Sequence, residues 1–274
     1  MRILVIADLH FDHWLRGDRN PLAAIYPLLE TLDAVILAGD VANNPEHGWP
    51  NILGWLKYLI EPKKIWLIPG NHDYYGFRLD GDDRLREIAE ENGANFLQKD
   101  VLELGGVRFI CCTLWSDFQL RGLPAEDMRA AARSLNDYQL IRRCEGGEII
   151  DPQDTALVHA DHRAWLEGEL ARPFDGRTVV VTHHVPSISV SGRVDAISPA
   201  FGSNLDDLII RHAPVLWLCG HTHRHLAAMV GQSEVRNVSL GYPSEVPAFL
   251  HESILLSGLM DTGQEGGRLL VHDP

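Results

Sequence analysis

Short runs of hydrophobic residues recur along the chain, and each ends in a glycine, a proline or a polar residue. The runs are rich in valine and isoleucine and do not alternate with polar positions. Such runs are typical of strands that are buried on both faces of a sheet. The predicted strands cover residues 3–7, 34–38, 64–68, 108–112, 178–181 and 214–219.

Helical patterns separate the early strands. They cover residues 21–32, 49–60 and 82–93, and the last begins with acidic residues and ends at Gly93. This alternation predicts an α/β fold with helices outside a sheet. The pair Gly105 and Gly106 predicts a hairpin turn, which adds an antiparallel strand before residues 108–112.

Residues 120–172 interrupt the series of strands with mostly helical patterns. We expect an insertion over one face of the sheet, because the segment lacks the features of a separate domain with its own core. No internal repeat or linker divides the chain. The prediction is therefore a single domain over residues 1–274, with the helical insertion at about 120–172.

Composition narrows the class of protein. The 274 residues are 45% hydrophobic and 23% charged, as in folded soluble proteins. No apolar run approaches the ~20 residues of a membrane helix, and no export signal is visible, so we expect a cytoplasmic protein without a membrane partner. The four cysteines lack the spacing of a zinc site, and buried thiols are expected.

The net charge of −14 argues against strong binding to a nucleic-acid backbone. It does not exclude a small phosphoester as the substrate, because bound cations can create a local positive site on an acidic protein.

Polar side chains follow five of the six predicted strands, at the end where α/β sheets bind ligands. Aspartate, asparagine and histidine are costly in a core unless they are paired or bound to a metal ion. In extended backbone, residues two apart point the same way and can reach one ion. Mixed oxygen and imidazole ligands suit Mn, Fe, Zn, Co or Ni. The candidate ligands are Asp8 and His10; Asp40; Asn71; His183 and His184; His221 and His223.

Structural alternatives exist for some of these residues. Asp8 and Asp40 are also suitable helix N-caps after strands. Asn71 suits a turn after Pro-Gly, and His72 is compatible with a buried histidine whose hydrogen bonds are satisfied.

In order, the motifs DLH at 8–10, GD at 39–40, GNHD at 70–73, the histidine pair and GHTH at 220–223 resemble those of the calcineurin-like metallophosphoesterase superfamily. They extend from Asp8 to His223. The stretches TLWSDF at 113–118, DYQLI at 137–141 and GYPSE at 241–245 resemble a bacterial branch of small metallophosphoesterases.

The resemblance implies a four-layer α/β/β/α sandwich with two divalent metal ions at the sheet edges. One ion would be held by Asp8, His10, Asp40 and His223. The other would be held by Asp40, Asn71, His221 and one histidine of the pair. His184 is preferred because HVP follows the family pattern, and His183 is the alternative.

His72 would face the phosphoryl group, with Asp73 orienting it. Contacts with the substrate are expected from His13, Trp14, Tyr74 and Arg193.

By the same resemblance, the protein would hydrolyse phosphomonoesters or phosphodiesters through attack of a hydroxide that bridges the two ions. The alternatives are a nuclease or a cyclic-nucleotide phosphodiesterase, which would use the same ligands. A protein phosphatase fits less well, because VANN follows Asp40 without the downstream RG, and GNHD replaces GNHE. A scaffold without catalysis also fits less well, because the ligands and His72 are all present.

Overall fold

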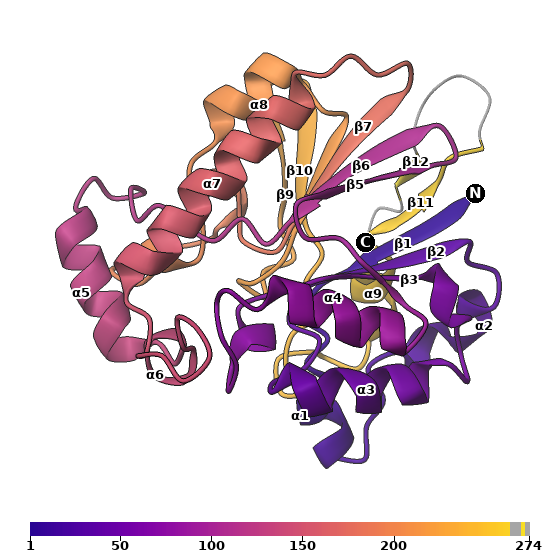
Figure 1. The fold of residues 1–274 in the computed structure, drawn as a ribbon. Coiled ribbons are helices and arrows are strands. Elements are labelled where there is room, and N and C mark those ends of the chain that lie inside the picture. Colours follow the sequence, from indigo (N-terminus) through magenta and orange to yellow (C-terminus); the bar gives the residue numbers. More distant parts are fainter. Residues whose placement is uncertain (264–269, 272–274) are drawn as a thin grey trace.

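The hydrophobic strands form two mixed sheets that face each other (Figure 1). The structure is a computed structural model that describes residues 1–263 and the backbone of residues 270–271. In spatial order, the first sheet consists of β12 (Leu270–Val271), β11 (Leu259–Asp261), β1 (Arg2–Ile6), β2 (Ala34–Ala38), β3 (Ile65–Ile68) and β4 (Asn95–Phe96). The second consists of β5 (Asp100–Leu104), β6 (Val107–Cys112), β7 (Arg177–Thr182), β8 (Leu216–Cys219), β10 (Ser233–Asn237) and β9 (Ala227–Val230).

Most neighbouring strands are parallel. In the first sheet β1 to β4 run parallel, and in the second β6, β7, β8 and β10 do. The strands β11, β12, β5 and β9 pair antiparallel at the sides. The loops that follow the parallel strands therefore gather at one edge of each sheet, where ligands bind in folds of this kind.

Three buried layers explain why the strands are apolar on both faces. Ile3 and Val5 of β1 point toward the second sheet, where they share a core with Phe109. Leu4 and Ile6 point outward, beneath helices. On the far side of the second sheet another core lies beneath the helices α7 (Pro152–Leu170) and α8 (Asp206–His212). The predicted four-layer α/β/β/α sandwich is confirmed.

Helices cover the outer face of the first sheet (Figure 1). They are α1 (Phe11–Arg16), α2 (Tyr26–Leu29), α3 (Pro45–Leu56), α4 (Asp82–Glu91) and α9 (His251–Leu256). The helix expected over 21–32 is only a 3₁₀ turn, η1 (Ala23–Ile25), followed by the single turn of α2. Pro27 has no N–H to donate to Ala23, so a continuous helix over 21–32 would lack this hydrogen bond and is disfavoured.

The predicted insertion contains α5 (Pro124–Ser134), α6 (Asp137–Leu140) and α7. Leu166 and Leu170 of α7 pack into the outer core of the second sheet. The helix starts with a capping box, in which the Asp151 carboxylate accepts from the Asp154 N–H and the Asp154 carboxylate accepts from the Asp151 N–H. In Figure 1, α5 and α6 lie beyond one end of α7, the end nearest the loops that follow the parallel strands.

The structure also bears on the cysteines and on the expected lack of a membrane helix. Cys111, Cys112 and Cys219 are buried in strands, as expected, whereas Cys144 is exposed; all four are free thiols. Within residues 1–263 and 270–271, no helix has both the length and the apolar character needed to cross a membrane.

The layer between the sheets should contribute strongly to stability. Phe109 is fully buried there, whereas Phe249 is 84% exposed. We predict that Phe109→Ala lowers the free energy of unfolding by about 3–5 kcal/mol, because it removes buried contacts and leaves a cavity. Phe249→Ala, the same chemical change, should lower it by less than about 0.5 kcal/mol. Equilibrium denaturation with urea measures both; equal losses would contradict this assignment of the core.

Candidate metal centre

Backbone hydrogen bonds join the two sheets just beyond the carboxyl ends of their parallel strands. The chain continues past β1 and pairs with the chain past β10, with Ala7 opposite Ser239 in parallel register. Ala7 N–H donates to Val238 O at 3.1 Å, and Leu240 N–H donates to Ala7 O at 2.8 Å. This pairing brings the loop after β1 next to loops of the second sheet, so side chains from both sheets meet.

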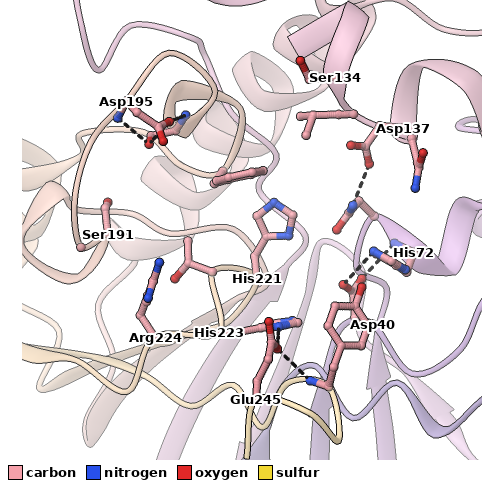
Figure 2. Close-up of a pocket in the computed structure, with 18 of the residues that line it drawn as sticks. Asp40, His72, Ser134, Asp137, Ser191, Asp195, His221, His223, Arg224 and Glu245 are labelled. Carbon is pink, nitrogen blue, oxygen red and sulfur yellow. Dashed lines mark hydrogen bonds and ion pairs between the residues drawn. The ribbon is translucent and has the colours of Figure 1, made fainter. Parts of the chain in front are cut away.

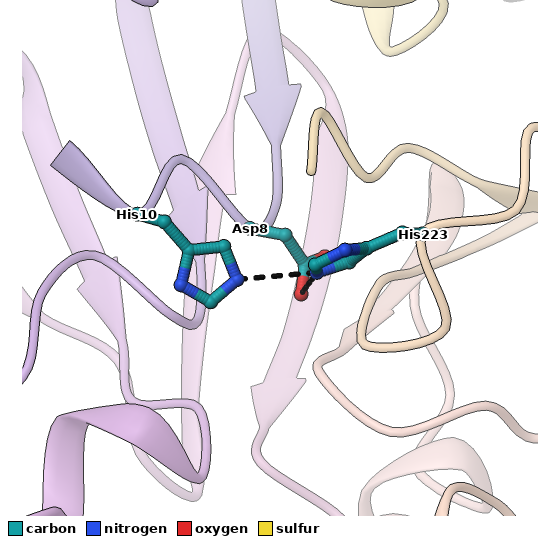
Figure 3. Close-up of side chains that lie close together, drawn as sticks. All are labelled: Asp8, His10 and His223. Carbon is teal, nitrogen blue, oxygen red and sulfur yellow. Dashed lines mark hydrogen bonds and ion pairs between the residues drawn. The ribbon is translucent and has the colours of Figure 1, made fainter. Parts of the chain in front are cut away.

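One cluster of metal-binding side chains contains Asp8, His10 and His223 (Figure 3). The Nε2 atoms of His10 and His223 lie 3.1 Å apart, and His223 Nε2 lies 3.3 Å from Asp8 Oδ1. His10 Nε2 is also 3.6 Å from Asp40 Oδ2. The second Asp8 oxygen accepts a hydrogen bond from the His221 N–H at 2.8 Å, which fixes the carboxylate.

A second cluster contains Asp40, His183 and His221, with Asn71 beside them. His183 Nε2 lies 3.3 Å from Asp40 Oδ1, 3.1 Å from Asn71 Oδ1 and 3.2 Å from His221 Nδ1. The two oxygens of Asp40 therefore face different clusters, Oδ2 toward His10 and Oδ1 toward His183. Asp40 occupies a bridging position.

The residues present fit a pair of cations. Burial lowers the pKa of His10, His183 and His221, so these imidazoles are neutral and have lone pairs available to a cation. Burial, followed by the charge of Asp8, raises the pKa of Asp40. Several lone pairs thus converge in a buried space, an arrangement that bound cations would stabilise.

His223 responds differently. Burial lowers its pKa, but hydrogen bonds with Asp8 and Glu245 outweigh that effect and raise it to about 10. Burial would likewise raise the pKa of Asp8, but the hydrogen bond and charge of His223 hold it well below its usual range. The His223 ring is thus held between two carboxylates, those of Asp8 and Glu245.

The structure reverses the preference between the two adjacent histidines. His183, and not His184, points into the cluster around Asp40. His184 is buried on the other side of the backbone, where its Nδ1 lies 3.3 Å from Thr113 O and its ring packs against Trp115. Successive side chains in extended backbone point in opposite directions, so only one of the pair can reach the cluster.

Asp73 does not orient His72, contrary to our expectation. Its carboxylate accepts hydrogen bonds from Trp49 Nε1 and from four backbone N–H groups, those of Asp40, Val41, Ala42 and Gly70. Burial raises its pKa to about 6 despite these hydrogen bonds. Asp73 therefore shapes the loops that carry Asp40 and Asn71.

Asn43 contacts the His72 ring instead. Its Oδ1 lies 2.9 Å from His72 Nδ1, while the His72 N–H donates to Asp40 Oδ1 at 2.9 Å. His72 Nε2 lies 3.9 Å from Asp40 Oδ2, and the ring lines the cavity above the clusters.

Two further carboxylates hold members of the clusters. Asn71 Nδ2 donates to Asp137 Oδ1 at 2.7 Å, which turns the Asn71 Oδ1 toward His183. Glu245 Oε2 lies 2.7 Å from His223 Nδ1. The sequence assigned neither residue a role, although both lie in stretches singled out by resemblance, DYQLI and GYPSE.

The backbone at the site is tightly constrained. A Cβ atom on Gly39, which has φ +93°, would lie 2.2 Å from His183 Nδ1. A Cβ atom on Gly220 would lie 2.5 Å from Asp8 Oδ2. Several of the clustered residues also have positive φ, which is uncommon outside glycine and is often found at functional sites: Asp8, His10, Asp40, His221 and His223.

A cavity of about 950 Å³ opens above the clusters (Figure 2). Its floor includes Asp40, Asn71, His72, His221 and His223. From there it extends toward residues 134–137 of the insertion and, on another side, toward residues 191–198 and 224–226.

Of the four expected substrate contacts, only Arg193 lines this cavity. Trp14 is fully buried, and its Nε1 donates to Gly241 O at 3.0 Å. Tyr74 is also buried, and its hydroxyl donates to Asp82 at 2.5 Å. His13 lies outside the lining, with its ring 4.8 Å from that of Tyr242. The lining aromatic residues are Tyr75, Phe201 and Tyr242.

The chain is similar in sequence to known proteins. The chain is 26% identical over 267 residues to a glycerophosphodiester phosphodiesterase of Enterobacter lignolyticus, an alignment that covers 92% of this chain and 78% of that protein. It is 25% identical over 269 residues to the uncharacterized protein L509 of Acanthamoeba polyphaga mimivirus, covering 89% and 93% of the two chains.

Solved structures share the fold. The phosphopantetheinyl hydrolase of Mycobacterium tuberculosis superposes with a TM-score of 0.69 at 21% identity, over 89% of this chain and 90% of the other. A family model described as calcineurin-like phosphoesterase matches residues 1–225, which contain both clusters. The resemblance seen in the sequence is confirmed: the chain belongs to the calcineurin-like phosphoesterase family.

Proposed function

We propose that this protein hydrolyses phosphodiesters of small alcohols with the help of two divalent metal ions. The observation that carries the proposal is the pair of clusters that share Asp40 at the floor of the cavity. A diester is favoured over a monoester because the cavity extends from this floor in two directions, which leaves space for a substituent on each side of the phosphate. The sequence similarity to a glycerophosphodiester phosphodiesterase supports the same choice.

In the proposed centre, Asp8, His10, Asp40 and His223 hold one ion, and Asp40, Asn71, His183 and His221 hold the other. Such a pair binds phosphate oxygens as a Lewis acid and lowers the pKa of water, whichever of the suitable divalent metals is bound. The protein supplies the spacing: Asp73 fixes the loop of Asp40, and Asp137 and Glu245 orient Asn71 and His223.

His72 is proposed to act on the phosphoryl group. Its Nδ1–H donates to Asn43, so in the neutral ring the lone pair is on Nε2, near Asp40 and the cavity. Burial, and then the charge of His183, lower the pKa of His72 to about 3. An anionic phosphoryl group beside Nε2 would raise that pKa. The ring would then be able to donate a proton or a hydrogen bond to the leaving oxygen.

A nuclease or a protein phosphatase would need access for a large substrate. Here the insertion lines one side of the cavity through Ser134, Leu135, Asn136 and Asp137, and the loop 191–198 lines another. Together with the net charge of −14, these walls favour a small organic phosphodiester over nucleic acid.

Hydrolysis should depend on bound metal. Chelator-stripped protein should be inactive, and Mn, Fe, Co, Ni or Zn should restore hydrolysis, with bis(p-nitrophenyl) phosphate turned over faster than p-nitrophenyl phosphate. Asp40→Asn should lower kcat by at least about 100-fold, because Asp40 serves both ions.

The matched control is Asp161→Asn, the same change at an exposed residue that pairs with Lys99. It should leave kcat unchanged. Faster turnover of the monoester would identify a phosphomonoesterase, and no turnover with any of the five metals would overturn the proposed function.

Asp137 should support metal binding through its hydrogen bond with Asn71. In Asp137→Ala the Asn71 amide loses the acceptor that fixes its orientation, so affinity for the second ion should fall about 10- to 100-fold. Asp137→Asn keeps an oxygen that can accept from Asn71 Nδ2 and should retain most of the affinity. Titration of Mn into each variant, followed by electron paramagnetic resonance of free Mn, measures this. Equal losses in both variants would show that the charge of Asp137, and not its role as an acceptor, matters.

Loss of the His72 side chain should affect turnover without affecting metal binding. His72→Ala should lower kcat by about 100-fold or more while two metal ions remain bound, because the ring acts on the substrate. Asn43→Ala should lower kcat less, through loss of the hydrogen bond that orients the ring. Metal content by mass spectrometry distinguishes the two cases, and loss of metal from His72→Ala would contradict the assignment.

A further inference from the structure

Two arginines on the cavity wall make no hydrogen bond or salt bridge with another described residue. Arg193 and Arg224 both line the cavity, and both are exposed. Among the residues that the structure describes, neither guanidinium has a hydrogen bond or a salt bridge. Arg193 contributes to lowering the pKa of Asp195, but only after the hydrogen bonds from Ser198 and Ile197. The two guanidinium groups are thus available to bind a ligand.

The carboxylates of the cavity wall are already engaged. Asp137 accepts from Asn71 and Tyr75. Glu245 contacts His223 Nδ1 and accepts from the Tyr242 N–H. Asp195 Oδ1 accepts from the Ser198 hydroxyl and from the N–H groups of Ser198 and Ile197. These carboxylates therefore use their acceptors elsewhere, and the donors of the two guanidinium groups remain unused on one wall of the cavity.

The two arginines lie on adjacent segments. Gly192 has φ +76°, and a Cβ atom there would lie 3.7 Å from both Cγ and Nε of Arg224, so the loop that carries Arg193 rests against the Arg224 side chain. Hydrogen bonds between Asp195 and Ser198 brace this loop. Figure 2 shows Arg224 and Ser191 on one side of the cavity, Asp40 and His72 on the other, and His221 and His223 between them.

We propose that Arg193 and Arg224 form a subsite for a second oxyanion, a phosphate or a carboxylate, carried by one of the two alcohols of the substrate. This inference rests on the proposed function and names the substrate class: a phosphodiester with an additional acidic group. Guanidinium groups bind such oxyanions through paired, charge-assisted hydrogen bonds.

The part of the cavity opposite Arg193 and Arg224 favours one orientation of the bound substrate. Its lining from the insertion, Ser134, Leu135, Asn136 and Asp137, contains no cation. An acidic alcohol is therefore attracted to the wall with Arg193 and Arg224, and a neutral alcohol fits the arm beside the insertion. With the reacting phosphate at Asp40, this asymmetry selects one orientation of the diester.

Two matched diesters test the subsite on the full chain loaded with Mn. They are thymidine 5′-(p-nitrophenyl phosphate) and the same compound with a 3′-phosphate. The 3′-phosphate should raise kcat/KM about 10-fold, the effect expected of hydrogen bonds to a charged group. Arg193→Gln and Arg224→Gln should each reduce this ratio toward one, mainly by raising KM for the phosphorylated diester.

Arg133→Gln is the control, because it removes the same charge from α5 outside the cavity lining. The ratio should be unchanged in it. A ratio near one in the wild type, or an equal fall in Arg133→Gln, would overturn the subsite while leaving the proposed hydrolysis intact.

If neither diester is hydrolysed, the proposed function fails, and calorimetry then tests the subsite separately. Thymidine 3′,5′-bisphosphate should bind about 10-fold more tightly than thymidine 5′-monophosphate, and this difference should depend on Arg193 and Arg224. Equal binding would overturn the subsite.

Discussion

The site depends on the backbone pairing of Ala7 with Ser239, which joins the two sheets where their parallel strands end. The donors of each cluster come from both sheets. Asp8 follows β1 of the first sheet, whereas His221 follows β8 of the second, and the His221 N–H donates directly to the Asp8 carboxylate. A shift of the sheets relative to each other would separate the ligands, so the core between the sheets serves the site as well as stability.

The positions of the strands were predictable because burial on both faces imposes uninterrupted apolar runs. The strand β10 was missed because Glu234 and Arg236 break its run, although these two side chains pair with each other. The edge to which most candidate ligands belong was also predictable, since the ends of parallel strands coincide. The choice between His183 and His184 was not, because it depends on which face of the backbone each side chain occupies.

Supporting residues were harder to find than the candidate ligands. Asp73 accepts hydrogen bonds mainly from backbone N–H groups, which every sequence supplies, so the sequence does not reveal these partners. The expected contact with His72 rested only on the two residues being neighbours in the sequence. Trp14 and Tyr74 lie next to motif residues in the sequence, yet their side chains fill the core. Asp137 lies 66 residues from Asn71, and such a distant contact leaves no periodicity in the sequence.

The link between Asp137 and Asn71 also bears on how this family can diversify. An insertion that only borders a cavity can be exchanged between relatives to change specificity, as loops on a rigid scaffold often are. Here α6 provides the oxygen that sets the orientation of an amide at the floor. An insertion taken from a relative would have to place an equivalent acceptor beside Asn71. A change in the insertion would therefore affect both substrate recognition and the orientation of a candidate metal ligand.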